Sequence, residues 1–193
     1  KIAISYGIYL PMLCEPFIRL HNHRITEEEK ERFIYYFICS SLFDDFTDYH
    51  LISKEQLYKL SFEYDHYQAT TFGEKVFLYT HKTLRDFVKD TAEYDRISQQ
   101  LYEAQLRSQL QHQSRLSFEE LKEITFDKGG YSVLLCSHYL NDEVENIEYH
   151  CWYKTGAVIQ LINDRYDIHK DLQDEITTLP NSMKEVYEFE KLF

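Results

Sequence analysis

The sequence predicts an all-α protein, and three observations support this fold class. Only 5 glycines and 3 prolines occur in 193 residues, which leaves little turn chemistry for a many-stranded β protein. Three Ser/Thr-x-x-Glu/Gln patterns, typical of helix starts, precede apolar residues at helical spacing. The chain has no repeat, low-complexity segment or Pro/Gly/Ser-rich linker, so we expect a single helical domain over residues 1–193.

The helices of the first half are predicted from capping boxes and prolines. In chain order we expect helices over residues 2–14, 27–49, from Lys54 through Leu60, and 74–113. The first is apolar and ends near Pro11 and Pro16. Capping boxes at Thr26–Glu29 and Ser53–Gln56 set the next two starts. The fourth is expected from a long run of polar residues with apolar residues at helical spacing.

The second half is predicted to contain two further helices around an apolar segment. A capping box at Ser117–Glu120 opens the first of them, and Gly129-Gly130 is expected to break it. Residues 131–140 are apolar and are closed by Asn141-Asp142. The last long helix is expected over residues 143–172, and Pro180 prevents much continuation.

Charge and cysteine content exclude several classes of function. The net charge of −12 makes the chain a poor ligand for nucleic acids and anionic membranes. No apolar run approaches the roughly 18 residues of a membrane span, and no signal peptide is visible. The four cysteines, which have neither CxxC nor zinc-ligand spacing, are Cys14, Cys39, Cys136 and Cys151. We therefore expect no transmembrane segment, mainly buried free thiols and a cytoplasmic protein.

The first group of functional candidates is an acidic cluster on an apolar helix. Asp44, Asp45 and Asp48 interrupt the apolar helix predicted over residues 27–49. Asp44 and Asp48 are four residues apart, so they share a helix face and their charges repel. The cluster is either a solvated helix face or a site for something positive.

The second group lies near the end of the last predicted helix. Asn163, Asp167 and Asp171 recur every four residues and would form a stripe about 12 Å long. A surface stripe partnered locally by Arg165 and Lys170 is the alternative. Hard oxygen ligands without cysteine or histidine favour Mg²⁺, and two such clusters would clamp a diphosphate through bound ions.

Together, these two clusters resemble the metal-binding motifs of a known superfamily. Asp44-Asp45-Phe46-Thr47-Asp48 matches the DDxxD motif of class I isoprenoid (terpene) synthases. Asn163, Asp167 and Asp171 resemble the NSE/DTE motif of the terpene cyclases in that superfamily. The order of the motifs also suits the family, and the resemblance is strongest over residues 27–175.

The resemblance implies a fold, a reaction and a set of ligands. The fold would be a helical bundle around a central pocket, and the chain would be a lyase that forms homodimers. Mg²⁺, three ions per active site, would be held by Asp44, Asp45, Asp48, Asn163, Asp167 and Asp171. The reaction would be ionisation of an allylic prenyl diphosphate, with release of diphosphate and cyclisation or rearrangement of the carbocation. Arg115, Lys128 and Lys170 would contact the diphosphate, and some of the 17 Tyr and 13 Phe would line the pocket.

Two other functions compete with a terpene synthase. Asn163-Asp164-x-x-Asp167, preceded by Gly156 and Gln160, also resembles the second aspartate-rich motif of chain-elongating prenyltransferases, and the aspartate spacing resembles head-to-head condensing enzymes too. No Arg-Arg pair follows Asp48, as elongating enzymes usually have. The third candidate is a non-catalytic helical protein whose acidic patches bind cations or a basic partner. Because 22 residues follow Asp171, the family's C-terminal lid helices are expected to be absent.

Overall fold

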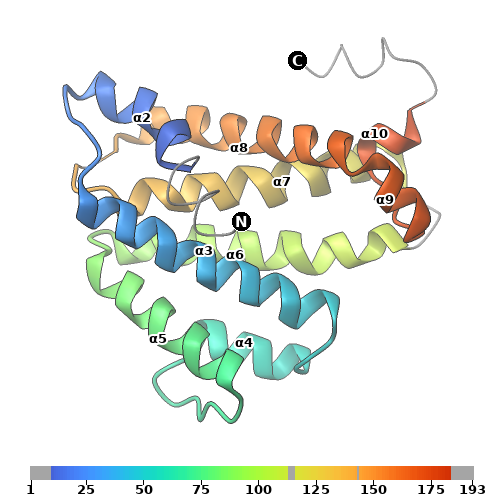
Figure 1. Ribbon diagram of the computed structural model, residues 1–193, viewed down its shortest axis with the longest axis horizontal. Coiled ribbons are helices and arrows are strands. Elements are labelled where there is room, and N and C mark those ends of the chain that lie inside the picture. The colour runs from blue at the N-terminus through green and yellow to red at the C-terminus, as the bar shows by residue number, and fades with distance from the viewer. Residues whose placement is uncertain (1–9, 113–115, 143, 184–193) are drawn as a thin grey trace. The chain divides into compact units, whose positions relative to one another are not determined.

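A computed structural model describes residues 10–112, 116–142 and 144–183 (Figure 1). This part of the chain is entirely helical and contains no β-strand, which confirms the all-α class. The chain divides into two compact units. The first comprises Lys1–Thr91 with His138–Glu143, and the second comprises Ala92–Ser137 with Val144–Phe193. The single domain over residues 1–193 stays a prediction.

Among the described residues, the first unit contains helices α2 (Leu10–Leu20), α3 (Glu27–Asp48), α4 (Lys54–Phe62) and α5 (Phe72–Phe87). Its core includes the fully buried side chains of Phe33 and Leu60. Helices α3 and α5 pack together through the rings of Phe46 and Phe77, whose centroids lie 6.0 Å apart. The starts predicted for α3 and α4 are confirmed, because both capping boxes are formed.

Residues 2–9 of the first predicted helix lie outside the described residues. Helix α2 includes both Pro11 and Pro16 and does not end near them. Pro11 occupies the first turn, where a backbone N–H has no intrahelical acceptor to lose. Pro16 removes the hydrogen bond that the Met12 carbonyl would accept, and Met12 is exposed to solvent. Two prolines are therefore tolerated, one at the helix start and one on an exposed turn.

The long helix predicted over residues 74–113 is two helices, α5 and α6 (Thr91–Ser108), followed by the 3₁₀ turn η2 (Gln109–His112). Val88 ends α5 with extended backbone (φ −73°, ψ 122°) and a buried side chain. Asp90 stands directly before α6, and aspartate is among the residue types that most favour a helix start. A fourth capping box, at Thr71–Glu74, begins α5 two residues before the predicted start.

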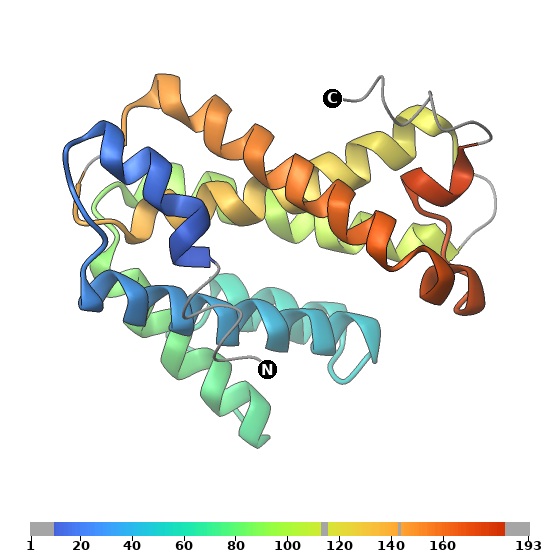
Figure 2. The same ribbon diagram turned by 45° about the horizontal axis from the view of Figure 1, so that its top comes forward.

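The second unit is built on α7 (Phe118–Cys136) and α8 (Asn146–Tyr166), which lie side by side in both views (Figures 1 and 2). Gly129 and Gly130 do not break α7, contrary to the prediction. A Cβ atom on Gly129 would lie 2.5 Å from Gln160 Cβ, and one on Gly156 would lie 2.8 Å from Val133 Cβ. The glycines are needed because the two helix backbones touch at Gly129 and Gly156.

The last predicted helix, over residues 143–172, is interrupted at Asp167 between α8 and α9 (Ile168–Gln173). Asp167 leaves helical geometry (φ −87°, ψ 5°), yet its N–H still donates to Asn163 O at 2.9 Å. The short helix α10 (Leu179–Ser182) follows, with Pro180 in its first turn. The 3₁₀ turn η3 (Ser137–Tyr139) follows α7.

Two further sequence expectations concern cysteines and membranes. Cys14, Cys39 and Cys136 are buried free thiols, as predicted, and Cys151 is an exposed one. Burial raises the pKa of the Cys14 thiol to about 12. Within the described ranges, no helix combines the length and the hydrophobicity that a membrane crossing requires.

Candidate functional site

The first acidic motif occupies the C-terminal end of α3. Asp45 and Asp48 are exposed and Asp44 is half-buried, whereas Phe46 and Thr47 between them are buried. The Thr47 hydroxyl donates to the carbonyls of Phe43 and Asp44 at 3.0 and 2.9 Å, which holds this turn helical. The last turn of α3 carries no basic residue. Carboxylates at the negative end of a helix dipole create a potential that favours a cation.

The second motif spans the interruption between α8 and α9. Asn163 and Asp167 are exposed, and Asp171 is buried. The predicted four-residue register persists, because Asp171 N donates to Asp167 O at 2.8 Å just as Asp167 N donates to Asn163 O. The break therefore changes the direction of the chain while the three residues remain on successive turns.

Asp171 has the least favourable environment for a carboxylate in this motif. The residue is only 8% exposed. Burial raises its pKa, and the charges of Asp164 and Asp167 raise it further, while Lys170 acts in the opposite direction. A buried carboxylate surrounded by like charges gains more than an exposed one from a bound cation.

Asp164, which is not one of the six predicted ligands but belongs to the alternative aspartate-rich motif, is part of the same acidic group. It is 8% exposed and accepts hydrogen bonds from Thr125 Oγ1 at 3.0 Å and Gln160 Nε2 at 2.7 Å. Burial raises its pKa, against the effect of these two bonds and of Lys128. Asp164 therefore links α8 to α7 through Thr125.

Two of the three predicted diphosphate contacts lie at the second motif. Lys128 is half-buried and close enough to Asp164 to lower its pKa. Lys170 is exposed and has the same effect on Asp171. Arg115 lies outside the described residues. Each of these two lysines therefore lies near one of the buried carboxylates of the second unit.

A separate cluster in the second unit is fully paired and serves packing. Asp127 binds Arg107 of α6 and accepts a hydrogen bond from Tyr153 Oη at 2.5 Å. The ring of Tyr153 meets that of Tyr131 edge to face, with centroids 5.1 Å apart. Burial and the Asp127 carboxylate raise the pKa of Tyr153. The cluster joins α6, α7 and α8 within the second unit.

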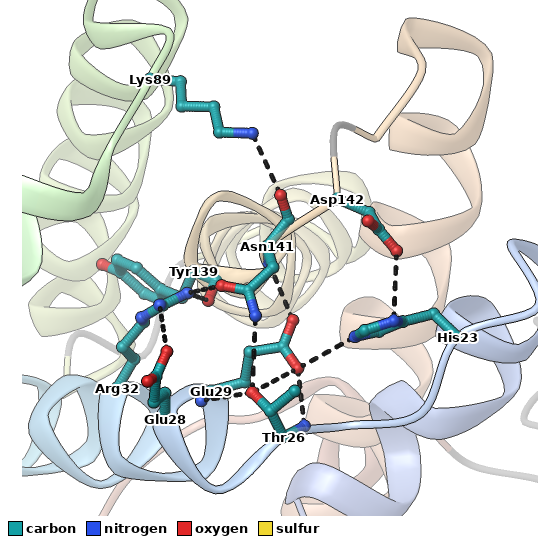
Figure 3. Close-up of polar contacts among 9 residues, drawn as sticks. All are labelled: His23, Thr26, Glu28, Glu29, Arg32, Lys89, Tyr139, Asn141 and Asp142. Atoms are coloured by element: carbon teal, nitrogen blue, oxygen red, sulfur yellow. Dashed lines mark hydrogen bonds and ion pairs between the residues drawn. The ribbon is translucent and has the colours of Figure 1, made fainter.

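The first unit contains a buried polar cluster around Glu29 (Figure 3). The Glu29 carboxylate is fully buried and accepts hydrogen bonds from Thr26 N, Thr26 Oγ1 and Asn141 N at 2.7, 3.0 and 2.7 Å. Arg32 Nη1 donates to Tyr139 O at 2.9 Å and to Asn141 Oδ1 at 2.7 Å. This cluster, hereafter the Glu29 cluster, holds the segment after α7 against the start of α3.

The outer part of the Glu29 cluster is only partly paired, because the buried His23 Nε2 and Arg32 Nε have no hydrogen-bond partner among the described residues. His23 lies between two carboxylates, 3.5 Å from Glu29 Oε2 and 3.8 Å from Asp142 Oδ2. Lys89 Nζ donates to Asn141 O at 3.0 Å, and Figure 3 shows it approaching Asn141 from the side opposite Glu29. These contacts join the segment after α7 to the start of α3, so the cluster stabilises the first unit.

The predicted metal ligands fit Mg²⁺ by chemistry but do not form an assembled group. Among residues 10–112, 116–142 and 144–183, no three His, Cys, Asp or Glu side chains are arranged to hold a metal ion. The two motifs belong to different units, and each unit is described by itself. The side chains of the two motifs suit Mg²⁺ because they offer oxygen donors only, including the buried Asp171 carboxylate. Asn163, Asp167 and Asp171 would hold an ion in the second unit, and Asp44, Asp45 and Asp48 in the first.

Comparison with known proteins yields no assignment. No protein-family model, no curated protein and no solved structure matches the chain.

Proposed function

We propose that the chain is a Mg²⁺-dependent terpene synthase of the class I type, acting on an allylic prenyl diphosphate. The observation that carries the proposal is the Asp171 carboxylate, which is buried and whose pKa is raised by that burial and by the charges of Asp164 and Asp167. Such a carboxylate is costly to keep charged unless a cation binds it. The DDxxD pattern at Asp44–Asp48, in which Asp45 and Asp48 are exposed, supports the same chemistry.

The residues have distinct roles in the proposed reaction. Bound Mg²⁺ would supply positive charge that stabilises the departing diphosphate. The chain would hold the ions through the six motif residues, while Lys128 and Lys170 would contact the diphosphate oxygens. The allylic C–O bond breaks with its electron pair leaving on the diphosphate, and the resulting carbocation cyclises or rearranges and then loses a proton.

The surroundings of Asp164 favour a terpene synthase over a chain-elongating prenyltransferase. In the elongating interpretation, Asp164 belongs to the aspartate-rich metal motif Asn163-Asp164-x-x-Asp167. Both of its carboxylate oxygens already accept hydrogen bonds, from Thr125 and Gln160, and its side chain is buried. Asn163 and Asp167 are exposed and are the better placed oxygen donors. The set Asn163, Asp167 and Asp171, which resembles the cyclase motif, is therefore preferred.

Incubation with prenyl diphosphates tests the reaction. Geranyl, farnesyl and geranylgeranyl diphosphates would each be incubated with Mg²⁺ or with EDTA. Diphosphate release would be measured, and products would be identified by gas chromatography–mass spectrometry. We expect release and a hydrocarbon or alcohol product only with Mg²⁺. Consumption only when isopentenyl diphosphate is added would indicate elongation, and turnover in EDTA would contradict the proposal.

Substitution at Asp171 links the reaction to the observation that carries it. Asp171→Asn removes the charge without changing the size of the side chain, so we expect loss of diphosphate release with an unchanged helical circular dichroism spectrum. Asp174→Asn is the matched control, because Asp174 is exposed and ends the same short helix. Equal activity in both variants would remove Asp171 from the site.

Thermal unfolding with and without Mg²⁺ tests ion binding apart from chemistry. The single tryptophan, Trp152, is buried in α8 of the second unit and reports its unfolding. Mg²⁺ at 100 times its Kd would stabilise the second unit by about 2.7 kcal/mol, since it binds only the folded state. We expect the rise in Tm to disappear in Asp171→Asn and to persist in Asp174→Asn. Ion binding without diphosphate release would favour the non-catalytic function.

A further inference from the structure

One side of α8 carries apolar side chains that the second unit leaves exposed. Ile147 and Tyr166, near the two ends of the helix, are 79% and 82% exposed. Val158 and Ile162 are 38% and 40% exposed, and Cys151 is also exposed. With the half-buried Thr155, these residues form the α8 stripe: Ile147, Cys151, Thr155, Val158, Ile162 and Tyr166. Contiguous exposed apolar residues usually mark an interaction surface.

The α8 stripe lies on a different side of the helix from the residues already given a role. At about 100° of rotation per residue, its six members fall within a sector about 100° wide. Tyr153, Gly156 and Gln160, which face α7, lie on the opposite side. Asn163 lies about 110° from the centre of the stripe. A partner bound to the stripe would therefore disturb neither the contact between α8 and α7 nor the proposed metal ligands.

The spacing within the stripe is the same from either end. Successive members are four, four, three, four and four residues apart. If a second copy of α8 lay antiparallel to the first, Cys151 of one copy would lie level with Ile162 of the other. Thr155 would lie level with Val158, and Ile147 with Tyr166. An antiparallel pair would thus match every member of the stripe with another member.

Charge at the two ends of α8 favours the same antiparallel arrangement. The first turn carries Glu148, and the last turn carries Arg165. The two residues lie at opposite edges of the stripe, and the Glu148 carboxylate also accepts a hydrogen bond from Glu145 N at 3.0 Å. An antiparallel pair places Glu148 of one copy level with Arg165 of the other. A parallel pair would instead place like charges together at each end. Electrostatic complementarity of this kind sets the orientation of paired helices.

We propose that the α8 stripe is a homodimer surface on which two copies of the chain pair their α8 helices antiparallel about the midpoint between Thr155 and Val158. The surface is independent of the proposed reaction, because it contains none of the six predicted metal ligands. It takes a second copy of this chain rather than an unrelated partner, since its spacing and its end charges complement themselves.

A disulfide trap tests the pairing, because the native Cys151 would face position 162 of the other copy. Ile162→Cys should give a covalent dimer under mild copper-phenanthroline oxidation, seen on a non-reducing gel and lost with reductant. The matched control is Cys151→Ser with Ile162→Cys, which should stay monomeric. The wild-type protein should also stay monomeric on this gel, because its two Cys151 residues would be about 16 Å apart along the helix axes.

The outcome separates the proposed pairing from other occupants of the stripe. Native wild-type protein should sediment at twice the mass of one chain, and Arg165→Glu should shift it towards the monomer by placing a second carboxylate beside Glu148. No more covalent dimer in Ile162→Cys than in the double variant would overturn the proposal. If the thiol introduced by Ile162→Cys were inaccessible to maleimide in a monomeric protein, the proposal would also fail, since another part of the chain would then cover the stripe.

Discussion

Each of the two units is stabilised internally by a different kind of contact. The first unit buries charge: Glu29 has no exposed surface, and its carboxylate accepts hydrogen bonds from Thr26 and from Asn141, 112 residues further along the chain. In the second unit, Gly129 and Gly156 have no side chains, so the backbones of α7 and α8 touch at these two residues. We therefore expect the first unit to be sensitive to hydrogen bonding and pH, and the second to side-chain volume.

The largest effect should come from adding volume in the second unit. Gly156→Ala would place a Cβ atom against the Gly129 carbonyl group and 2.8 Å from Val133 Cβ. Because backbone atoms cannot move aside as a flexible side chain can, we expect a loss of about 3 kcal/mol in the free energy of unfolding. Urea denaturation followed by Trp152 fluorescence would measure it.

Gly73→Ala is the control for that substitution. Gly73 is also helical, but an added Cβ atom would lie 3.4 Å from the Phe46 ring, close to an ordinary contact. Because alanine loses less backbone entropy on folding, we expect a change between zero and a gain of about 1 kcal/mol. Equal destabilisation by Gly73→Ala and Gly156→Ala would show that glycine is not specifically required at the α7–α8 contact.

The next largest effect should come from removing charge in the first unit. Glu29→Gln replaces one acceptor oxygen by an NH₂ group, which would face the N–H of Thr26 or Asn141. One buried donor then lacks an acceptor, at a cost of about 1–3 kcal/mol. Hydrogen exchange of residues 138–142 and of α3 should speed up. Glu27→Gln, on an exposed side chain of the same helix, should leave this exchange unchanged.

The smallest effect is an opposite response of the two units to acid. Burial alone would raise the pKa of Glu29, but the bonds from Asn141 and Thr26 together lower it. The ionised Glu29 carboxylate therefore stabilises the folded state at pH values above its pKa in the unfolded chain. This contribution is lost as the pH falls through the lower pKa that Glu29 has in the folded state. Burial raises the pKa values of Asp164 and Asp171, so their contribution is most favourable below the unfolded pKa of 3.8 and is lost as the pH rises through the folded values.

Urea midpoints measured between pH 7 and pH 4 in a chelator would resolve these two responses. Glu29→Gln should weaken the acid sensitivity of the first unit. Asp171→Asn should raise the midpoint of the Trp152 transition at pH 7, where repulsion is greatest, and flatten its pH dependence. A lower midpoint for Asp171→Asn at pH 7 would mean that the carboxylate is already well compensated in the absence of a cation.

The helix starts could be predicted because their determinants are local. The boxes at Thr26, Ser53 and Ser117 act within four residues, so the sequence alone identifies them. The roles of Gly129 and Gly156 could not be predicted, since the contact joins two helices far apart in the sequence. A glycine pair that breaks an isolated helix is kept helical here by packing against a neighbour.

The candidate site, like the fold, could be predicted from the sequence only in part. The spacing of Asn163, Asp167 and Asp171 and the run at Asp44–Asp48 are visible in the sequence and predicted oxygen ligands. Which carboxylate is buried depends on tertiary packing, and it distinguishes Asp171 from Asp167. Asp164 could not be assigned from the sequence, because its partner Thr125 lies 39 residues away on another helix.

The segment from His138 to Asp142 has a consequence for the order of folding. It belongs to the first unit, although it follows α7 and precedes α8, the two main helices of the second. During synthesis on a ribosome, Glu29 emerges long before Asn141, the residue whose N–H it binds. Until then its carboxylate must stay hydrated, so the start of α3 cannot close over it. The first unit is thus completed only after α7 of the second has been made.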